Sequence, residues 1–273
     1  MEDAKTVAET KQEEVVGNLS YLKAVKAFFN EFGCLTSFTF RFFREVFKPR
    51  YEFNEVLKQS YLIGYKSFPL IALTAFIMGL VLTIQSRPTL VQFGAVSWLP
   101  AMVAVSLIRE LGPAITALVF GGKVGSGIGA ELASMRVTEQ IDAMEVSGIN
   151  PFKYLVVTRV LATTLTLPLL VVLSDSVSLF STYIAVNMKD NVSTPLFISQ
   201  VFQSINFSDL FPSIIKTFFF GFAVGIVSCY MGYNSNTGTE GVGKAANSSV
   251  VFGSISIFVL DLIAVQITNL IYN

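Results

Sequence analysis

The chain has 273 residues, of which 52% are hydrophobic and 14% charged, and its formal net charge is zero. This composition is typical of a membrane protein, and the balanced charge gives no indication of nucleic-acid binding. Because the sequence has no histidine and only two cysteines, Cys34 and Cys229, we expect no metal site, no cofactor and no Ser-His or Cys-His nucleophile.

The N-terminal region is expected to stay in the cytoplasm. Residues 1–18 are polar and partly acidic, unlike a cleaved signal peptide. From Leu19 to Lys48, polar or small residues recur every three or four positions, which predicts a helix with a basic face and a Phe-rich face. We expect this amphipathic helix to lie in the cytoplasmic membrane interface, and residues 19–60 to comprise it and a connector. A helix packed on a soluble domain is the alternative.

Residues 61–273 are expected to form the membrane domain, with five helical spans. The apolar stretches long enough to cross a hydrocarbon core of about 30 Å are Ser67–Ser86, Leu99–Gly122, Leu155–Val186, Thr217–Tyr233 and Val250–Ile271. None shows the short alternating pattern of a barrel strand. The sequence therefore predicts an all-α integral membrane protein.

Lysine and arginine predict the orientation of these spans. The segment before the first span is rich in both, whereas the next loop carries only Arg87, which places the N-terminus inside. Five spans then leave the C-terminus outside. In this topology the loop with Arg136 and Lys153 is cytoplasmic, and Lys189 and Lys216 lie outside.

Four charged residues interrupt the apolar spans, namely Arg109, Glu110, Asp175 and Asp261. Each costs at least about 2.5–3.5 kcal/mol unless it is paired or hydrated. Arg109 and Glu110 are adjacent, so they point about 100° apart on a helix and each needs a partner elsewhere. We expect Asp261 to pair with Arg109. Such charges either hold helices together or line a substrate cavity, and the Gly-Pro pair that follows Glu110 can kink the helix.

A row of small residues follows at intervals of four, consisting of Gly121, Gly125, Gly129 and Ala133. Such a ridge lets another helix approach closely, either within the chain or between subunits. Gly125–Ala130 also fits a relaxed dinucleotide fingerprint, but no alternation of strands and helices surrounds it. Gly238–Lys244 begins like a phosphate-binding loop, yet Ala245 stands where a hydroxyl should hold magnesium. We therefore expect no nucleotide site in this chain.

Ser134–Glu145 follows the ridge as a short amphipathic segment whose exposed positions include Arg136, Glu139, Gln140 and Asp142. From the residues alone, a solvated connector would account for it.

The stretch SLIRELGPAITALVFGGKVGSGIGAELASMRVTEQIDAMEVSGINPFKYLVVTRVLA, with a dense match over about Ser106 to Leu170, resembles the signature region of MlaE-type permeases. These are the transmembrane subunits of ABC transporters that work with MCE-domain proteins in lipid transport. The resemblance implies a homodimer in the bacterial inner membrane, with a pocket between the subunits that receives phospholipid and opens toward the periplasm. It also implies that a separate cytoplasmic ATPase dimer binds ATP.

The resemblance also implies roles for particular residues. The cytoplasmic coupling helix corresponds to the segment after the ridge, so the residues expected to dock into the ATPase are Arg136, Glu139, Gln140 and Asp142. The residues expected to line the lipid cavity are Leu82, Gln85, Arg109, Glu110, Leu111 and Asp261. Asp175 and the 234–249 connection match no part of the family pattern that assigns them a role.

A mechanical coupling fits these expectations. Closure of the ATPase dimer would push on Ser134–Glu145, the glycine-ridge helix would transmit the push to Arg109–Pro113, and the cavity would narrow and expel lipid. The competing class is an ion-coupled secondary transporter or channel that uses Glu110, Asp175 and Asp261. A passive scaffold for a periplasmic partner is a third possibility. The direction of transport and the headgroup preference stay open.

Overall fold

The computed structural model describes residues 30–48, 52–189, 191–235 and 238–272. The chain divides into two compact units, Met1–Lys48 and Pro49–Asn273. In the first unit, residues 30–46 are helical, and the phenylalanines that stay largely exposed are Phe32, Phe40, Phe43 and Phe47. The predicted helix from residue 19 to 29 and the polar segment 1–18 lie outside the described residues. The interfacial location of this helix stays a prediction.

The second unit is a helical bundle, and no strand occurs in the parts of the chain that the structure describes. Its elements are, in order, α2 (Phe53–Gln92), η1 (Val96–Trp98), α3 (Leu99–Ser106), η2 (Leu107–Leu111), α4 (Gly112–Phe120), η3 (Gly121–Gly125), α5 (Ser126–Val137), α6 (Gln140–Val146), η4 (Phe152–Val157), α7 (Thr158–Asn187), α8 (Thr194–Ser204), α9 (Phe207–Tyr233) and α10 (Thr239–Tyr272). The turns η2, η3 and η4 are π-helical. Because η2 and η3 join α3, α4 and α5 without a break, these elements form one continuous helix that is locally widened.

The five predicted spans are confirmed, and the chain is a multi-pass membrane protein. The helices long and apolar enough to cross a membrane are Phe53–Gln92, Val96–Val137, Phe152–Asn187, Phe207–Tyr233 and Thr239–Ile271. The second has 42 residues, so it is about 60 Å long, roughly twice the hydrocarbon thickness. This helix is therefore too long for all of it to lie across the hydrocarbon core along the membrane normal.

The fourth span begins ten residues earlier than predicted, at Phe207 instead of Thr217. Its first half contains the charged residues Asp209 and Lys216, and charged residues are more typical of a loop than of a membrane span. In the structure both side chains form ion pairs with other helices of the bundle. Lys216 thus lies within the fourth span and not in the loop before it, because a paired lysine can stay within a membrane helix.

Small and hydroxyl-bearing residues explain how the long helices approach one another. α7 is the most covered span and packs mainly on α2 and α9. At Gly79 of α2, an added Cβ would overlap Ser181 and the backbone of Ser178. At Gly221 of α9 it would lie 2.6 Å from the carbonyl oxygen of Thr163. Close packing around bare backbone is the usual source of helix association in lipid, where no hydrophobic effect acts between helices.

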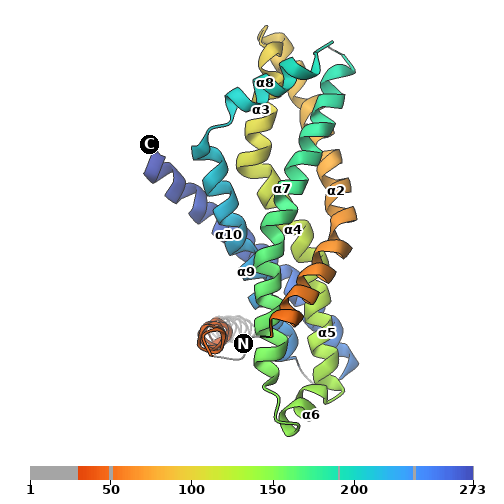
Figure 1. The fold of residues 1–273 in the computed structure, drawn as a ribbon, viewed down its shortest axis with the longest axis vertical. Helices are drawn as coiled ribbons and strands as arrows, with labels where there is room; N and C mark the ends of the chain where they lie inside the picture. Colours follow the sequence, from red (N-terminus) through yellow and green to blue (C-terminus); the bar gives the residue numbers. More distant parts are fainter. Residues whose placement is uncertain (1–29, 49–51, 190, 236–237, 273) are drawn as a thin grey trace, which may run out of the picture. The chain divides into compact units, whose positions relative to one another are not determined.

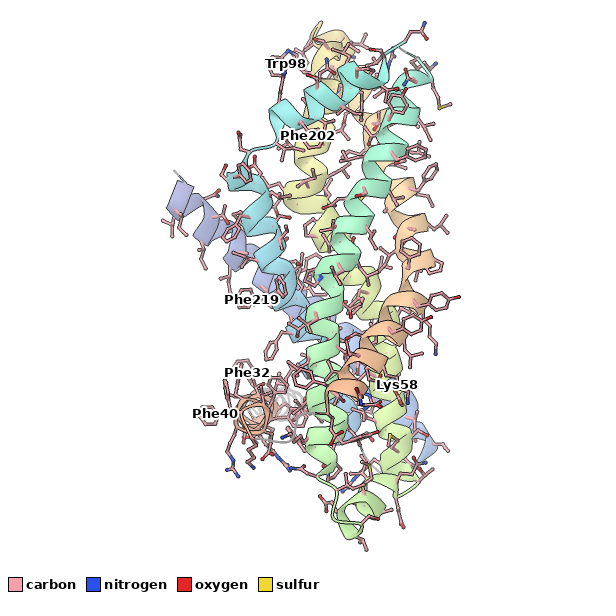
Figure 2. All side chains as sticks on the ribbon, in the orientation of Figure 1. Phe32, Phe40, Lys58, Trp98, Phe202 and Phe219 are labelled. Carbon is pink, nitrogen blue, oxygen red and sulfur yellow. The ribbon has the colours of Figure 1, made fainter. Side chains whose placement is uncertain are left out.

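The two ends of the bundle carry short helices that do not cross the membrane. Figure 1 shows α6 at one end and α8 with the start of α3 at the other. The sequence reading did not predict α8, although its apolar residues are spaced as on one helix face and Phe197 and Val201 are buried there. At the same end Trp98 and Phe202 are exposed (Figure 2).

Candidate functional site

A buried lysine joins three helices within the apolar part of the bundle. Lys216 of α9 is only 5% exposed at its side chain, and its Nζ donates to Oε2 of Glu110 at 2.6 Å and to Oδ1 of Asp261 at 3.0 Å. Glu110 belongs to η2 and Asp261 to α10. We call these three residues the Lys216 junction. Each charge has an opposite charge beside it, which lowers the cost of placing it among apolar helices.

The π-helical turn η2 carries Glu110, and it leaves one backbone carbonyl next to α9 without its usual helical hydrogen bond. The N–H of Gly112 bonds to the carbonyl of Leu107, five residues back, so the carbonyl of Ile108 loses its usual partner. The hydroxyl of Ser213 in α9 donates to that carbonyl at 2.7 Å. Pro113 follows directly and has no N–H to continue the ladder. The irregular turn is therefore held by α9, the helix that also supplies Lys216.

The predicted pairing of Arg109 with Asp261 is wrong. Nη1 of Arg109 lies 3.8 Å from Oδ1 of Asp209, in the first turn of α9, and Asp261 is bonded to Lys216 instead. The reason is that α9 begins earlier than expected, at Phe207. Asp209 and Lys216, which the predicted spans leave in a loop, therefore lie in the bundle. Asp209 also accepts a hydrogen bond from the backbone N–H of Asn206 and so caps its own helix.

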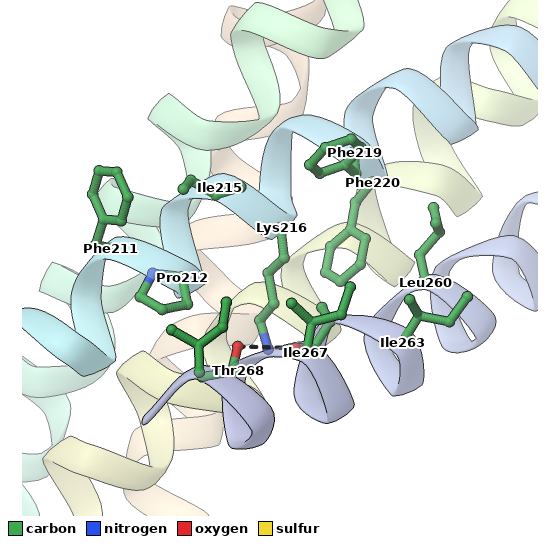
Figure 3. Close-up of a pocket in the computed structure, with 12 residues that line it drawn as sticks. Phe211, Pro212, Ile215, Lys216, Phe219, Phe220, Leu260, Ile263, Ile267 and Thr268 are labelled. Carbon is green, nitrogen blue, oxygen red and sulfur yellow. Dashed lines mark hydrogen bonds between the residues drawn. The ribbon is translucent and has the colours of Figure 1, made fainter. Parts of the chain in front are cut away.

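An apolar groove of about 340 Å³ runs beside the Lys216 junction between α9 and α10. Figure 3 shows Lys216 extending from α9 toward α10 along this groove. Its lining residues are Phe211, Pro212, Ile215, Lys216, Phe219, Phe220, Leu260, Ile263, Ala264, Ile267, Thr268 and Ile271. Lys216 is the one charged residue among them, so the groove has an apolar wall that carries a single charged group, the ammonium of Lys216. We call it the α9–α10 groove.

The remaining predicted cavity residues lie apart from this groove. Arg109 and Glu110 line a narrow cleft next to it, together with Asp209 and Lys216. Leu82 and Leu111 pack against the apolar cluster around α3 and α8. Gln85 is exposed on α2. Within one chain, the structure thus brings together Arg109, Glu110 and Asp261, and it adds Lys216, Asp209 and Ser213. The signal for Lys216 is the apolar sequence on both sides of it, SIIKTFFF.

Asp175 lies at the level of η2 but outside the Lys216 junction. Its Oδ1 is buried and makes no hydrogen bond to any described residue. It packs so closely on Gly112 that a Cβ at that glycine would overlap it. One turn away, Thr116 donates to the hydroxyl of Ser174 at 2.8 Å. α7 is thus in direct contact with the helix that carries Glu110.

The glycine ridge packs against α9 and α10 of the same chain. A Cβ at Gly121 would lie 3.4 Å from Val224, one at Gly125 would lie 2.9 Å from the hydroxyl of Ser228, and one at Gly129 would overlap Ser249. Ala133 is fully buried. These residues are helical, as are Gly241 and Gly243, so neither glycine motif forms a phosphate-binding loop between a strand and a helix.

The expected coupling segment is bent. α5 ends at Val137 and α6 begins at Gln140, because Glu139 takes the left-handed conformation with φ of 57°. Nη1 of Arg136 donates to Oδ1 of Asp142 at 2.6 Å across the bend, and Ile141 is buried below it. The single amphipathic segment expected from Ser134 to Glu145 is therefore two helices joined by an elbow. We call residues 136–146 the elbow.

Two comparisons with known proteins bear on the whole chain. The profile of the family described as Permease MlaE matches residues 56–267. A probable ABC transporter permease protein of Rickettsia typhi is 35% identical over 252 residues, which cover 92% of this chain and 97% of the relative. One of Synechocystis is 32% identical over 89% of each chain. A third, of Pyropia yezoensis, is 35% identical and covers 77% of this chain and 80% of its own length.

Proposed function

The chain belongs to the MlaE permease family of ABC transporters, and from that premise we propose that it moves phospholipid between the bacterial inner membrane and a periplasmic MCE-domain protein. The observation that carries the proposal is the Lys216 junction at the edge of the α9–α10 groove. An apolar groove beside paired charges matches a molecule with acyl chains and a charged headgroup. Arg109 and Glu110, 44% and 39% exposed at their side chains, offer a cation and an anion to such a headgroup.

A second copy of the chain would complete this site. Half-exposed charges within an apolar span cannot face acyl chains without a large cost, so Arg109 and Glu110 need a cover. α10 is the least covered span, and its exposed apolar residues include Val251, Ile255, Phe258, Val259 and Leu262. A twofold axis beside α9 and α10 would join two grooves into one enclosed cavity. We place the lipid site in that shared cavity.

The energy for transport would come from a separate ATPase dimer in the cytoplasm. The elbow presents Glu139, Gln140 and Asp142 at one end of the bundle, directly after the second span ends at Val137. Docking there would place α6 in the cytoplasm, the N-terminus inside and the C-terminus in the periplasm. In this proposal the permease itself binds no ATP and needs no cofactor.

Reconstitution tests this proposal. Proteoliposomes containing the permease and its ATPase are mixed with the soluble MCE domain, and phospholipid transfer between the two is followed with labelled lipid. We expect transfer that requires ATP and the ATPase, and at least a tenfold loss in Lys216→Met. Lys189→Met, which removes an exposed lysine just after the end of α7, is the control. Transfer driven by an ion gradient without the ATPase would instead identify an ion-coupled carrier, and transfer unaffected by Lys216→Met would contradict the assigned site.

A further inference from the structure

A buried arginine joins the two helices that lead away from the elbow. α5 enters the elbow, and α7 leaves it after α6 and η4, so the two helices are the legs of a hairpin with α6 at its tip. The side chain of Arg159 in α7 is 4% exposed. Its Nη2 donates to Oε1 of Glu131 in α5 at 2.8 Å, and its Nη1 donates to the carbonyl of Leu155 at 3.0 Å.

The two bonds use the fork of the guanidinium in a way that lysine could not. One arm is fixed to the backbone of the π-helical turn η4, and the other reaches across to the second leg. A planar guanidinium holds both directions at once, whereas an ammonium is a single point of charge. α5 and α7 each pack on α9, at Gly232 and at Gly225 respectively, and the side chain of Arg159 adds a direct bond between the two legs.

Stability alone is a weak reason for this arrangement. A buried ion pair often contributes less to stability than two well-packed apolar side chains of similar size. Here the cost is larger still, because Nε of Arg159 is buried and makes no hydrogen bond to a described residue, while Glu131 is 54% exposed. The pair buries part of a guanidinium at a cost in solvation free energy. Its role is therefore better explained by the relative position of α5 and α7 that it favours.

The legs connect the elbow to the candidate site along two routes. α5 continues upward through η3 and α4 to η2 and Glu110. α7 reaches the same level through Asp175, which packs on Gly112, and through the bond from Thr116 to Ser174. At the base of the hairpin, the rings of Phe152 and Tyr233 pack edge to face at 5.9 Å, which adds α9. A displacement of α6 reaches both legs through the chain, and the contacts that join the legs decide whether they move together.

We infer that the Arg159–Glu131 pair is a clamp that makes α5 and α7 move as one body when the elbow is displaced, so that it sets how much lipid is moved for each ATP hydrolysed. The inference rests on the proposed function. In this mechanism Arg159 is a positioning residue, since it lies far along the chain from Lys216 and takes no part in the Lys216 junction. Without the clamp the ATPase still docks, but part of the displacement of the elbow no longer reaches the lipid site, and less lipid is moved for each ATP hydrolysed.

The test separates coupling from stability by removing both partners. In Glu131→Leu/Arg159→Met no buried charge is left alone, so the complex should assemble and unfold at close to the wild-type temperature. We expect its ATPase rate to stay within about twofold of wild type and its lipid transfer per ATP to fall at least threefold. Glu131→Gln keeps a carbonyl acceptor for Arg159 and should retain most of the wild-type ratio. Lys58→Met, which removes an ion pair at an exposed lysine of α2 and keeps the hydrogen bond from Tyr154 of η4 to Glu55, is the control.

The possible outcomes are distinct. A double variant with wild-type stability and a wild-type ratio of lipid to ATP overturns the clamp. If the double variant does not assemble, Arg159→Lys, which keeps a cation beside Glu131 but cannot hold both bonds at once, should still lower the ratio, and an unchanged ratio there overturns the clamp as well. Failure of the wild-type complex to transfer lipid with ATP contradicts the proposed function instead.

Discussion

The Lys216 junction depends on one cation shared by two anions. Glu110 and Asp261 come from helices that are far apart in the sequence, and both bond to the same ammonium. Removing one carboxylate leaves Lys216 with the other, whereas removing both leaves a buried ammonium without a counter-charge. The two carboxylates are therefore expected to compensate for each other.

This compensation predicts the sign of the interaction free energy in a double-mutant cycle: the two substitutions together should destabilise more than the sum of their separate effects. Glu110→Gln and Asp261→Asn should each lower the free energy of unfolding modestly, and the double variant should lose about 1–3 kcal/mol more than the sum of the two. Equilibrium unfolding in mixed detergent micelles measures the difference. Lys216→Met combined with both changes should recover part of the loss, since no charge is then left alone. Additive losses would mean that the two carboxylates do not share the lysine.

Glu139 gives a second prediction at the scale of one residue. Its φ of 57° is unfavourable for any residue with a Cβ and most unfavourable for a β-branched one. Glu139→Gly should therefore be neutral or raise stability by up to about 1 kcal/mol, and Glu139→Val should lower it by about 1 kcal/mol or more. Thermal unfolding of the purified permease, without the ATPase, checks the order. Equal effects of glycine and valine would show that the elbow adopts another conformation.

At the scale of the helices, the glycine ridge offers a comparison within one helix. Gly127 and Gly129 both lie in α5, but a Cβ at Gly127 would meet nothing within 4 Å, whereas one at Gly129 would overlap Ser249 of α10. Gly127→Ala should be neutral or stabilising by up to about 1 kcal/mol, because alanine favours the helix. Gly129→Ala should destabilise by about 1–3 kcal/mol, because α5 and α10 must separate. Unfolding midpoints of the two variants give the comparison, and a tolerated Gly129→Ala would contradict the close approach.

The helices also show what periodicity and hydropathy can and cannot predict. Long apolar runs such as Ser67–Ser86 predict spans because the bilayer imposes a length, and each predicted span lies within an observed helix. The start of α9 was missed because Lys216 has no partner near it in the sequence, and its partners are residues 106 positions before and 45 after it. The π-helical turns were missed because a single changed hydrogen bond, such as that from Gly112 to Leu107, leaves no periodic signal.

On the scale of the whole chain, the family could be recognised from one continuous stretch, from Ser106 to about Leu170, and the profile match over residues 56–267 confirms it. The arrangement of the candidate site could not be read in the same way. It needs three helices to meet, and the contacts of Glu110 and Asp261 with Lys216 follow from packing between distant segments. The elbow combines both cases, since its charges were predicted and its bend at Glu139 was not.

The bend changes how the proposed ATPase contact should be tested. Asp142 is paired with Arg136, so reversing its charge alone also opens the elbow, whereas Glu139 is exposed and keeps the same backbone strain when it becomes lysine. We expect Glu139→Lys to weaken association with the ATPase at least tenfold, and Glu139→Lys/Asp142→Lys to abolish it, while the permease, including the dimer proposed above, persists in the membrane. Co-purification and size-exclusion chromatography measure the two separately. Lys189→Glu, at the opposite end of the bundle, should leave association unchanged. Normal association in the double variant would remove the elbow from the ATPase contact, and displacement of the elbow could then no longer drive the lipid site.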